Sequence, residues 1–256
     1  MPKIMFNGVE YAGSGGGGGG STWITDIPEM HRNIFRGQSL GSSVTAAQLA
    51  AIEDGSFDEL YVGDYWTIPV TINGAQTDIV WRIVDIDHYL NRGATAITTD
   101  HHLVIMPDSA LYSISMGSTN YYGVRSTVLA DAKTAVNDAF LNMVIPYSEF
   151  FGYTNGNLLY GDSAVEVPDV LSLTGNMLMR KDGTIADTHT ISFLQFALFR
   201  LAPQFMPSDV VYWTRDISNI NSSDYIVMDT SGRPGLHSYS ASAGVRPYFL
   251  IGVQNE

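Results

Sequence analysis

The clearest strand pattern in the sequence surrounds the dipeptide Asn73-Gly74. Two runs rich in β-branched and aromatic side chains, residues 65–72 and 78–86, flank this pair. Asn-Gly favours a type I′ turn, so the pattern predicts a β-hairpin. Pro69 lacks the N–H that a central strand needs, which places the first run at a sheet edge or a bulge. Residues 102–106 (HLVIM) predict a further strand, and residues 3–11 a short hairpin around their own Asn-Gly pair.

Three segments carry helical signals. Residues 45–48 (TAAQ) form a capping box in front of a short helix that stops at Gly55. Apolar residues recur at helical spacing over residues 127–143 and predict an amphipathic helix. Residues 192–195 (SFLQ) form a second capping box, which opens an apolar helix ending near Pro203.

The N-terminal part contains an unbroken glycine run at residues 15–20. Such a run has maximal backbone entropy and no side chains to bury, so residues 1–22 are predicted to form a flexible tether. An expression scar and a phosphate-binding loop are alternatives, although no Gly-Lys-Ser/Thr follows the run. Residues 23–256 are interpreted as one α+β domain, with Ω-like insertions at 155–163 and 176–187.

The C-terminal segment has a distinctive order. An aromatic-led strand begins at Tyr212, a polar stretch rich in Ser, Asn, Asp, Tyr and Gly follows, and residues 244–252 (GVRPYFLIG) form a hydrophobic closing strand. Rigid elements on both sides allow a surface segment to vary, which favours a binding protein over an enzyme. Trp81 and Trp213 are predicted to be core residues, and Arg246 to lock the last strand through a backbone carbonyl or a carboxylate.

Composition narrows the classes of partner. The chain has 256 residues and 45% hydrophobic content, enough for a substantial core. Its 26 acidic and 13 basic residues give a net charge of -13, which argues against nucleic acid and anionic membranes as partners. The absence of cysteine excludes disulfides and thiolate zinc sites. No apolar run approaches the roughly 18 residues of a membrane span, and the N-terminus lacks a secretion signal, so we expect synthesis in the cytoplasm.

Several of these segments together resemble a known family. They are residues 55–66, 81–87, 100–108, 125–127, 196–203 and 244–252. The ensemble resembles phage and prophage structural proteins of gut bacteria that carry a C-terminal C-type lectin-like domain, and it covers residues 45–253. The resemblance implies a lectin-like fold with a mixed, mainly antiparallel sheet, two or three helices and long inserted loops. It also implies a place in the virion, on a tail-associated or other structural protein.

Some members of that group are targets of diversity-generating retroelements, in which AAY codons become codons for Asn, Ser, Asp, Tyr, Gly, His and Thr. Residues 215–242 are enriched in this set, and an ordinary polar loop is the alternative explanation. The resemblance implies a variable ligand-binding surface within residues 213–242. Tyr225 and Tyr239 have polar surroundings in the sequence and are the candidate contact residues, because Tyr provides a large contact area at low entropy cost. The expected binding residues are Arg215, Asp216, Ser218, Asn219, Asn221, Ser222, Asp224, Tyr225, Asp229, Ser231, His237, Ser238, Tyr239 and Ser240.

Two kinds of chemistry remain as alternatives. Residues 161–163 (GDS) match the nucleophile tripeptide of a hydrolase superfamily, but they stand late in the chain and residues 187–189 (DTH) have the wrong spacing. A hydrolase using Ser163 and a purely structural decoration protein are therefore the alternative functions, and we expect no enzymatic activity. The possible metal ligands are Asp85, Asp87, His88, Asp100, His101 and His102. Neighbouring His101 and His102 point to opposite faces of a strand, which favours hydrogen-bonded strand ends over a metal site.

Cofactors and partners follow from the same reasoning. We expect no cofactor; calcium stays open, because Asp224 and Asp229 with Asn219 and Asn221 offer oxygen ligands. The resemblance implies a host cell-surface protein or glycan and other virion proteins as partners, without nucleic acid or membrane insertion. Tail fibres are commonly trimeric, so the resemblance favours a homotrimer, although residues 1–44 contain no heptad repeat.

Overall fold

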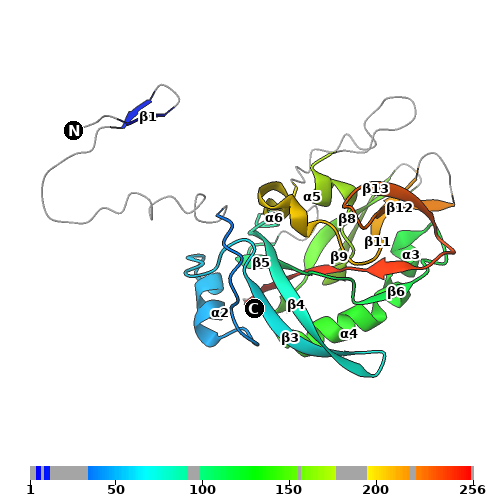
Figure 1. The fold of residues 1–256 in the computed structure, drawn as a ribbon, viewed down its shortest axis with the longest axis horizontal. Helices are drawn as coiled ribbons and strands as arrows, with labels where there is room; N and C mark the ends of the chain where they lie inside the picture. The colour runs from blue at the N-terminus through cyan, green and yellow to red at the C-terminus, as the bar shows by residue number, and fades with distance from the viewer. Residues whose placement is uncertain are drawn as a thin grey trace, which may run out of the picture.

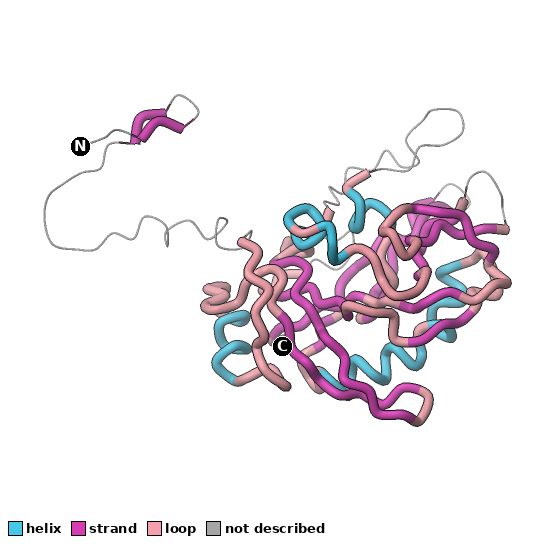
Figure 2. The backbone as a smooth tube through the Cα atoms, in the orientation of Figure 1, coloured by secondary structure: helices cyan, strands magenta, loops and turns pink. Residues whose placement is uncertain are grey.

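The protein has an α+β fold with mostly antiparallel sheets and a few short helices (Figures 1 and 2). It is described by a computed structural model over residues 4–6, 9–11, 34–91, 98–154, 157–176, 195–218 and 223–254. The predicted glycine tether at residues 15–20 lies outside these ranges, as do Asn219, Asn221 and Ser222.

The elements follow one another as a series of short strands and helices. The strands are β1 Ile4–Phe6, β2 Val9–Tyr11, β3 Tyr65–Ile72, β4 Ala75–Ile86, β5 His102–Pro107, β6 Tyr112–Ile114, β7 Val144–Ile145, β8 Tyr147–Thr154, β9 Asn157–Ser163, β10 Val165–Glu166, β11 Tyr212–Ile217, β12 Asp224–Met228, β13 Pro234–Ser238, β14 Ala243–Val245 and β15 Tyr248–Gly252. The helices are α2 Ala46–Glu53, α3 Tyr121–Val128, α4 Ala130–Ala139, α5 Val170–Thr174 and α6 Ala197–Leu201, with a 3₁₀ turn η1 at Pro203–Phe205.

The larger sheet confirms the predicted hairpin. Its strand order is β10-β15-β5-β4-β3, with β7 also pairing with β15. Strands β3 and β4 pair around Asn73 and Gly74, whose φ angles of 52° and 77° are those of a type I′ turn. Pro69 lies in β3, the edge strand, as predicted. The predicted strand at residues 102–106 is β5, and the N-terminal hairpin forms from β1 and β2.

The second sheet corrects the interpretation of the C-terminal polar stretch. Its order is β13-β12-β11-β14-β6, so the stretch contains two strands and is not a single irregular surface segment. The side chains of β12 alternate, as expected for a half-buried strand: Tyr225 and Val227 are buried, whereas Asp224 and Ile226, which precede them, are half-buried.

The helices differ from prediction mainly at their ends. The capping box of Thr45 and Gln48 is present and opens α2. In place of one helix over residues 127–143, α3 and α4 follow each other with a break at the fully buried Leu129, and Asn120 caps α3 by accepting a hydrogen bond from Gly123 N. The second predicted capping box begins at Ser192, which lies outside the described residues. The helix in this region, α6, starts after Phe196 without a side-chain cap, and Gln195 Nε2 donates to Leu173 O.

The predicted insertion at residues 155–163 is also corrected. Residues Asn157–Ser163 form β9, which pairs with β8 as an antiparallel ribbon over seven register positions. Of the second predicted insertion, at residues 176–187, only Asn176 lies within the described part of the chain.

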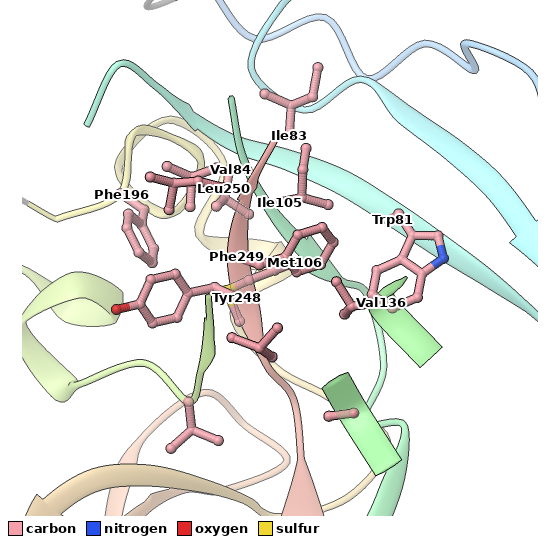
Figure 3. Close-up of a cluster of buried hydrophobic side chains, with 14 of the residues drawn as sticks. Trp81, Ile83, Val84, Ile105, Met106, Val136, Phe196, Tyr248, Phe249 and Leu250 are labelled. Carbon is pink, nitrogen blue, oxygen red and sulfur yellow. The ribbon is translucent and has the colours of Figure 1, made fainter. Parts of the chain in front are cut away.

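The core continues on both faces of the larger sheet. In Figure 3, Tyr248 of β15 points toward Phe196, with ring centroids 5.4 Å apart, and Phe249 points the other way, toward Trp81 and Val136. The rings of Phe249 and Trp81 are 5.6 Å apart, edge to face. Trp81 and Trp213 are fully buried, which confirms them as core residues.

Candidate ligand-binding surface

Two buried aromatic residues of the second sheet, Trp213 and Tyr225, lie beneath the predicted binding segment, and we call them the buried frame. Trp213 of β11 and Tyr225 of β12 are both 0% exposed, and their rings meet edge to face at 5.6 Å. Trp213 Nε1 donates to Ile114 O at 2.8 Å, and the Tyr225 hydroxyl donates to Ser118 O at 2.9 Å. Desolvation by burial raises the pKa of Tyr225 well above its usual value. The expectation that Tyr225 is an exposed contact residue is therefore corrected, because its position in β12 directs the ring onto Trp213.

Arg246 fixes the start of the closing strand, as predicted. Its side chain is buried, and Nε donates to Pro107 O, Nη1 to Met206 O and Nη2 to Phe205 O, each at 2.8 Å. Nη1 also donates to the Tyr212 hydroxyl at 3.3 Å. Arg246 therefore joins the closing strand to β5, to η1 and to β11.

Arg215 and Asp216 lie away from the exposed part of the segment. Arg215 is 8% exposed and pairs with Asp169, with Nη2 2.5 Å from Oδ2. Burial works to raise the pKa of Asp169, but the Arg215 charge and the hydrogen bonds of Ser172 leave it below its usual value. Asp216 Oδ2 accepts a hydrogen bond from Val170 N at 2.6 Å. Arg215 is thus corrected from a ligand contact to half of a buried ion pair.

The turn between β12 and β13 is organised by Asp229. Its Oδ1 accepts hydrogen bonds from Ser231 N at 2.8 Å and from Arg233 N at 2.9 Å. These backbone bonds, that of Arg233 first, lower the pKa of Asp229. Asp229 therefore has a turn-forming role. Ser231, another residue of the predicted binding set, is exposed in the same turn and stands at the end of the hairpin away from Asp224 and Ser238.

The opposite end of the same hairpin gathers most of the remaining predicted residues. Asp224 pairs with Ser238 in the strand register, and the hydroxyls of Ser238 and Ser240 are 2.9 Å apart. Tyr239 N donates to Ser223 O at 3.1 Å. We call this surface the Ser-rich end, which consists of Ser118, Ser223, Asp224, Ser238, Tyr239 and Ser240, all exposed or half-buried.

The Ser-rich end has two further neighbours from the predicted set. Ser218 is buried, and its N–H donates to Asp224 O at 2.9 Å, so it fixes the first residue of β12 and is not itself exposed to a ligand. His237 lies half-buried with its ring 5.2 Å from Trp213, and its Nε2 is 3.3 Å from Ser242 O. Ser118 is not among the predicted residues. It lies in the loop before α3, 107 residues before Tyr225, so the pattern of residues 213–242 could not indicate that it joins this surface.

The predicted calcium ligands separate between the two ends of β12. Asp224 begins the strand and Asp229 follows its last residue. At about 3.3 Å per residue the two carboxylates stand roughly 16 Å apart, so one calcium ion cannot bind both.

The His and Asp cluster at the ends of β4 and β5 forms hydrogen bonds, as predicted. His88 Nδ1 is 2.7 Å from Asp85 Oδ2, and His101 Nδ1 is 2.7 Å from Asp87 Oδ2. Burial lowers the pKa of His102 to about 4. Over the described ranges, no group of three or more His, Cys, Asp or Glu residues is arranged to hold a metal ion.

Ser163, the nucleophile of the alternative hydrolase, is 6% exposed. Its hydroxyl donates to the Glu166 carboxylate, and Arg125 Nη1 donates to Ser163 Oγ at 3.4 Å. Glu166 also accepts from the Tyr121 hydroxyl. This arrangement ties β9 and β10 to α3, and His189 lies outside the described residues.

Comparison with known protein families, curated proteins and solved structures finds no match for this chain. None of the helices in the described ranges is long and apolar enough to cross a membrane.

Proposed function

We propose that the chain is a ligand-binding structural protein of a phage or prophage particle. In this proposal its domain has a C-type lectin-like fold and binds a host cell-surface protein or glycan through the Ser-rich end. The protein acts in the virion together with other virion proteins, and it needs no catalytic step.

One observation carries the proposal: the hairpin of β12 and β13 combines buried core residues with polar residues that are exposed or half-buried. Tyr225 and Val227 of β12 face the core, whereas Asp224 and Ser238 are half-buried and Ser240 is exposed. Substitutions at such exposed positions usually change stability by less than about half a kcal/mol. The surface can therefore change its ligand without unfolding the domain, which is the property that a diversified receptor-binding segment needs.

The charge and the side chains of this surface narrow the class of ligand. A net charge of -13 disfavours nucleic acid. Hydroxyl-rich surfaces with a half-buried tyrosine, such as Tyr239, are typical of paratopes, in which Tyr supplies area and Ser supplies adaptable hydrogen bonds.

The test is direct binding to cells. The purified full chain, fluorescently labelled, is incubated with a panel of gut bacterial strains and measured by flow cytometry. We expect saturable binding to at least one strain, and Ser240→Arg should raise the half-saturating concentration about tenfold or more, corresponding to about 1.4 kcal/mol.

Ser231→Arg is the matched control, because it makes the same change at an exposed serine on the other end of the hairpin. It should leave binding unchanged. Absence of binding to every strain, or equal effects of the two substitutions, contradicts the proposal.

A further inference from the structure

Strand β11 holds the residues that lead into α5 through three polar contacts. Arg215 N donates to Pro168 O at 3.1 Å, and Arg215 Nη2 lies 2.5 Å from Asp169 Oδ2. Asp216 Oδ2 accepts a hydrogen bond from Val170 N at 2.6 Å. Two neighbouring residues of β11 therefore bind three consecutive residues at the start of α5, and we call this contact the α5–β11 seam.

The seam contains two carboxylates and one guanidinium. Asp169 uses both of its carboxylate oxygens, because Oδ1 accepts from Ser172 N at 2.6 Å while Oδ2 pairs with Arg215. Arg215 Nη1 also donates to the hydroxyl of Tyr248 in β15 at 3.0 Å. The guanidinium is therefore bonded to Asp169 and to Tyr248, so that an ionised Asp216 places a second negative charge beside Asp169.

This arrangement favours the neutral form of Asp216. Among the described residues, the charged groups that act on it are Asp169 of α5, which repels a negative charge, and Arg215 of β11, which attracts one. Desolvation by burial, followed by the charge of Asp169, raises the pKa of Asp216 to about 7. Below this pH, Asp216 accepts from Val170 N without repelling Asp169.

Opening of the seam exposes Asp216 to water and returns its pKa toward 3.8. The closed seam thus binds the proton more tightly than the open seam does. Raising the pH from about 4 to about 7 consequently favours the open seam, by up to about tenfold per pH unit. Above about pH 7, Asp216 is ionised in both states and the dependence ends.

Asp216 is connected along the chain to the Ser-rich end. The pairing of β11 with β12 shifts register between Trp213 and Ile217, and Asp216 lies within this irregular part. Two residues later, Ser218 N donates to Asp224 O at 2.9 Å. Opening of the seam releases the chain at Asp216 and so weakens the bond that fixes Asp224 in the Ser-rich end.

We propose that the α5–β11 seam is a pH-sensitive latch, which fixes the Ser-rich end while Asp216 is protonated and releases it when Asp216 is ionised. This inference rests on the proposed function, because it assigns a regulation to the same binding surface. A ligand should accordingly bind more tightly near pH 5 than near pH 7.5, since the surface is then held in one arrangement before the ligand arrives.

The test is amide hydrogen exchange of the full chain, followed by NMR near pH 5 and near pH 7.5 and expressed as protection factors. In the wild type, the protection factors of the Val170 and Ser218 amides should fall by about tenfold or more from the lower to the higher pH. Asp216→Asn should keep them equal at both pH values, because its neutral side-chain carbonyl still accepts from Val170 N. Asp138→Asn, at an exposed carboxylate on α4, is the control and should keep the wild-type dependence.

Equal protection of Val170 and Ser218 at the two pH values in the wild type overturns the inference without reference to any variant. A pH dependence that survives in Asp216→Asn also overturns it. The amide of Ile83, which donates to Asp64 O in the larger sheet, reports unfolding of the whole domain. If Val170 is as strongly protected as Ile83, the seam opens only when the domain unfolds, and it is not a latch.

The two proposals fail in distinguishable ways, because hydrogen exchange requires no ligand. If the seam amides lose protection as predicted but no bacterial strain is bound, the latch stands without the receptor role. If cells are bound in a Ser240-dependent manner while the seam amides do not respond to pH, the binding function stands and the latch does not.

Discussion

Replacing Arg246 with methionine is expected to destabilise the protein by about 3 kcal/mol. The side chain is buried and donates to three backbone carbonyls and one hydroxyl. Met206 O keeps a donor after the substitution, because the Tyr212 hydroxyl also donates to it at 2.8 Å. Pro107 O and Phe205 O lose the Arg246 donor, and a buried carbonyl left without a partner costs about 1–3 kcal/mol. Removing a desolvated charge offsets part of this sum.

The assay is thermal unfolding monitored by circular dichroism. For a chain of this size, a loss of about 3 kcal/mol lowers the melting temperature by roughly 6–12 °C. Arg246→Lys should also destabilise the protein, because one ammonium group cannot replace the fork of donors that reaches three separate oxygens.

Arg233→Met is the control, since Arg233 is exposed in the turn between β12 and β13. It should change stability by less than about half a kcal/mol. A melting temperature for Arg246→Met within about 2 °C of wild type would refute the assignment of Arg246 as the lock of the closing strand.

Two further substitutions test the packing of Gly244 and the burial of Asp216. Gly244→Ala places a Cβ 2.6 Å from the Ala110 side chain and should lower the free energy of unfolding, measured in urea, by about 1–3 kcal/mol. Gly235→Ala is the control and should not change it measurably, because the nearest atom to its Cβ is 3.9 Å away. Equal losses in the two variants would contradict the packing around Gly244. Desolvation, followed by the neighbouring carboxylate, raises the pKa of Asp216 from 3.8 to about 7, so its contribution to stability is present at low pH and is lost as pH rises toward 7. Asp216→Asn should therefore raise the melting temperature at pH 8 more than at pH 5, and an equal shift at both pH values would count against this linkage.

Local signals accounted for the elements that were predicted correctly. The hairpin of β3 and β4 follows from alternation around Asn73-Gly74, and α2 follows from its capping box. Both depend on contacts between residues close in sequence. The role of Arg246 was also foreseen, because a charge within a hydrophobic strand must find partners when the strand is buried.

The binding region was harder to predict because its geometry depends on distant parts of the chain. Arg215 finds Asp169, which lies 46 residues away, and Tyr225 finds Ser118, 107 residues away. Composition alone made Tyr225 look exposed, although the alternation of Tyr225 and Val227 was a signal for a half-buried strand. The break between α3 and α4 has no comparable signal, since Leu129 fits a helical pattern as well as a buried break.

A substitution scan over residues 212–252 tests the central claim most directly. A display library is sorted once for protease resistance, which reports folding, and once for binding to a bacterial strain that the wild type recognises. We predict that substitutions at Trp213 and Tyr225 fail both selections, that those at Ser238 and Ser240 remain folded but lose binding, and that those at Ser231 pass both. If the variants at Ser238 and Ser240 pass both selections, the Ser-rich end does not bind the ligand.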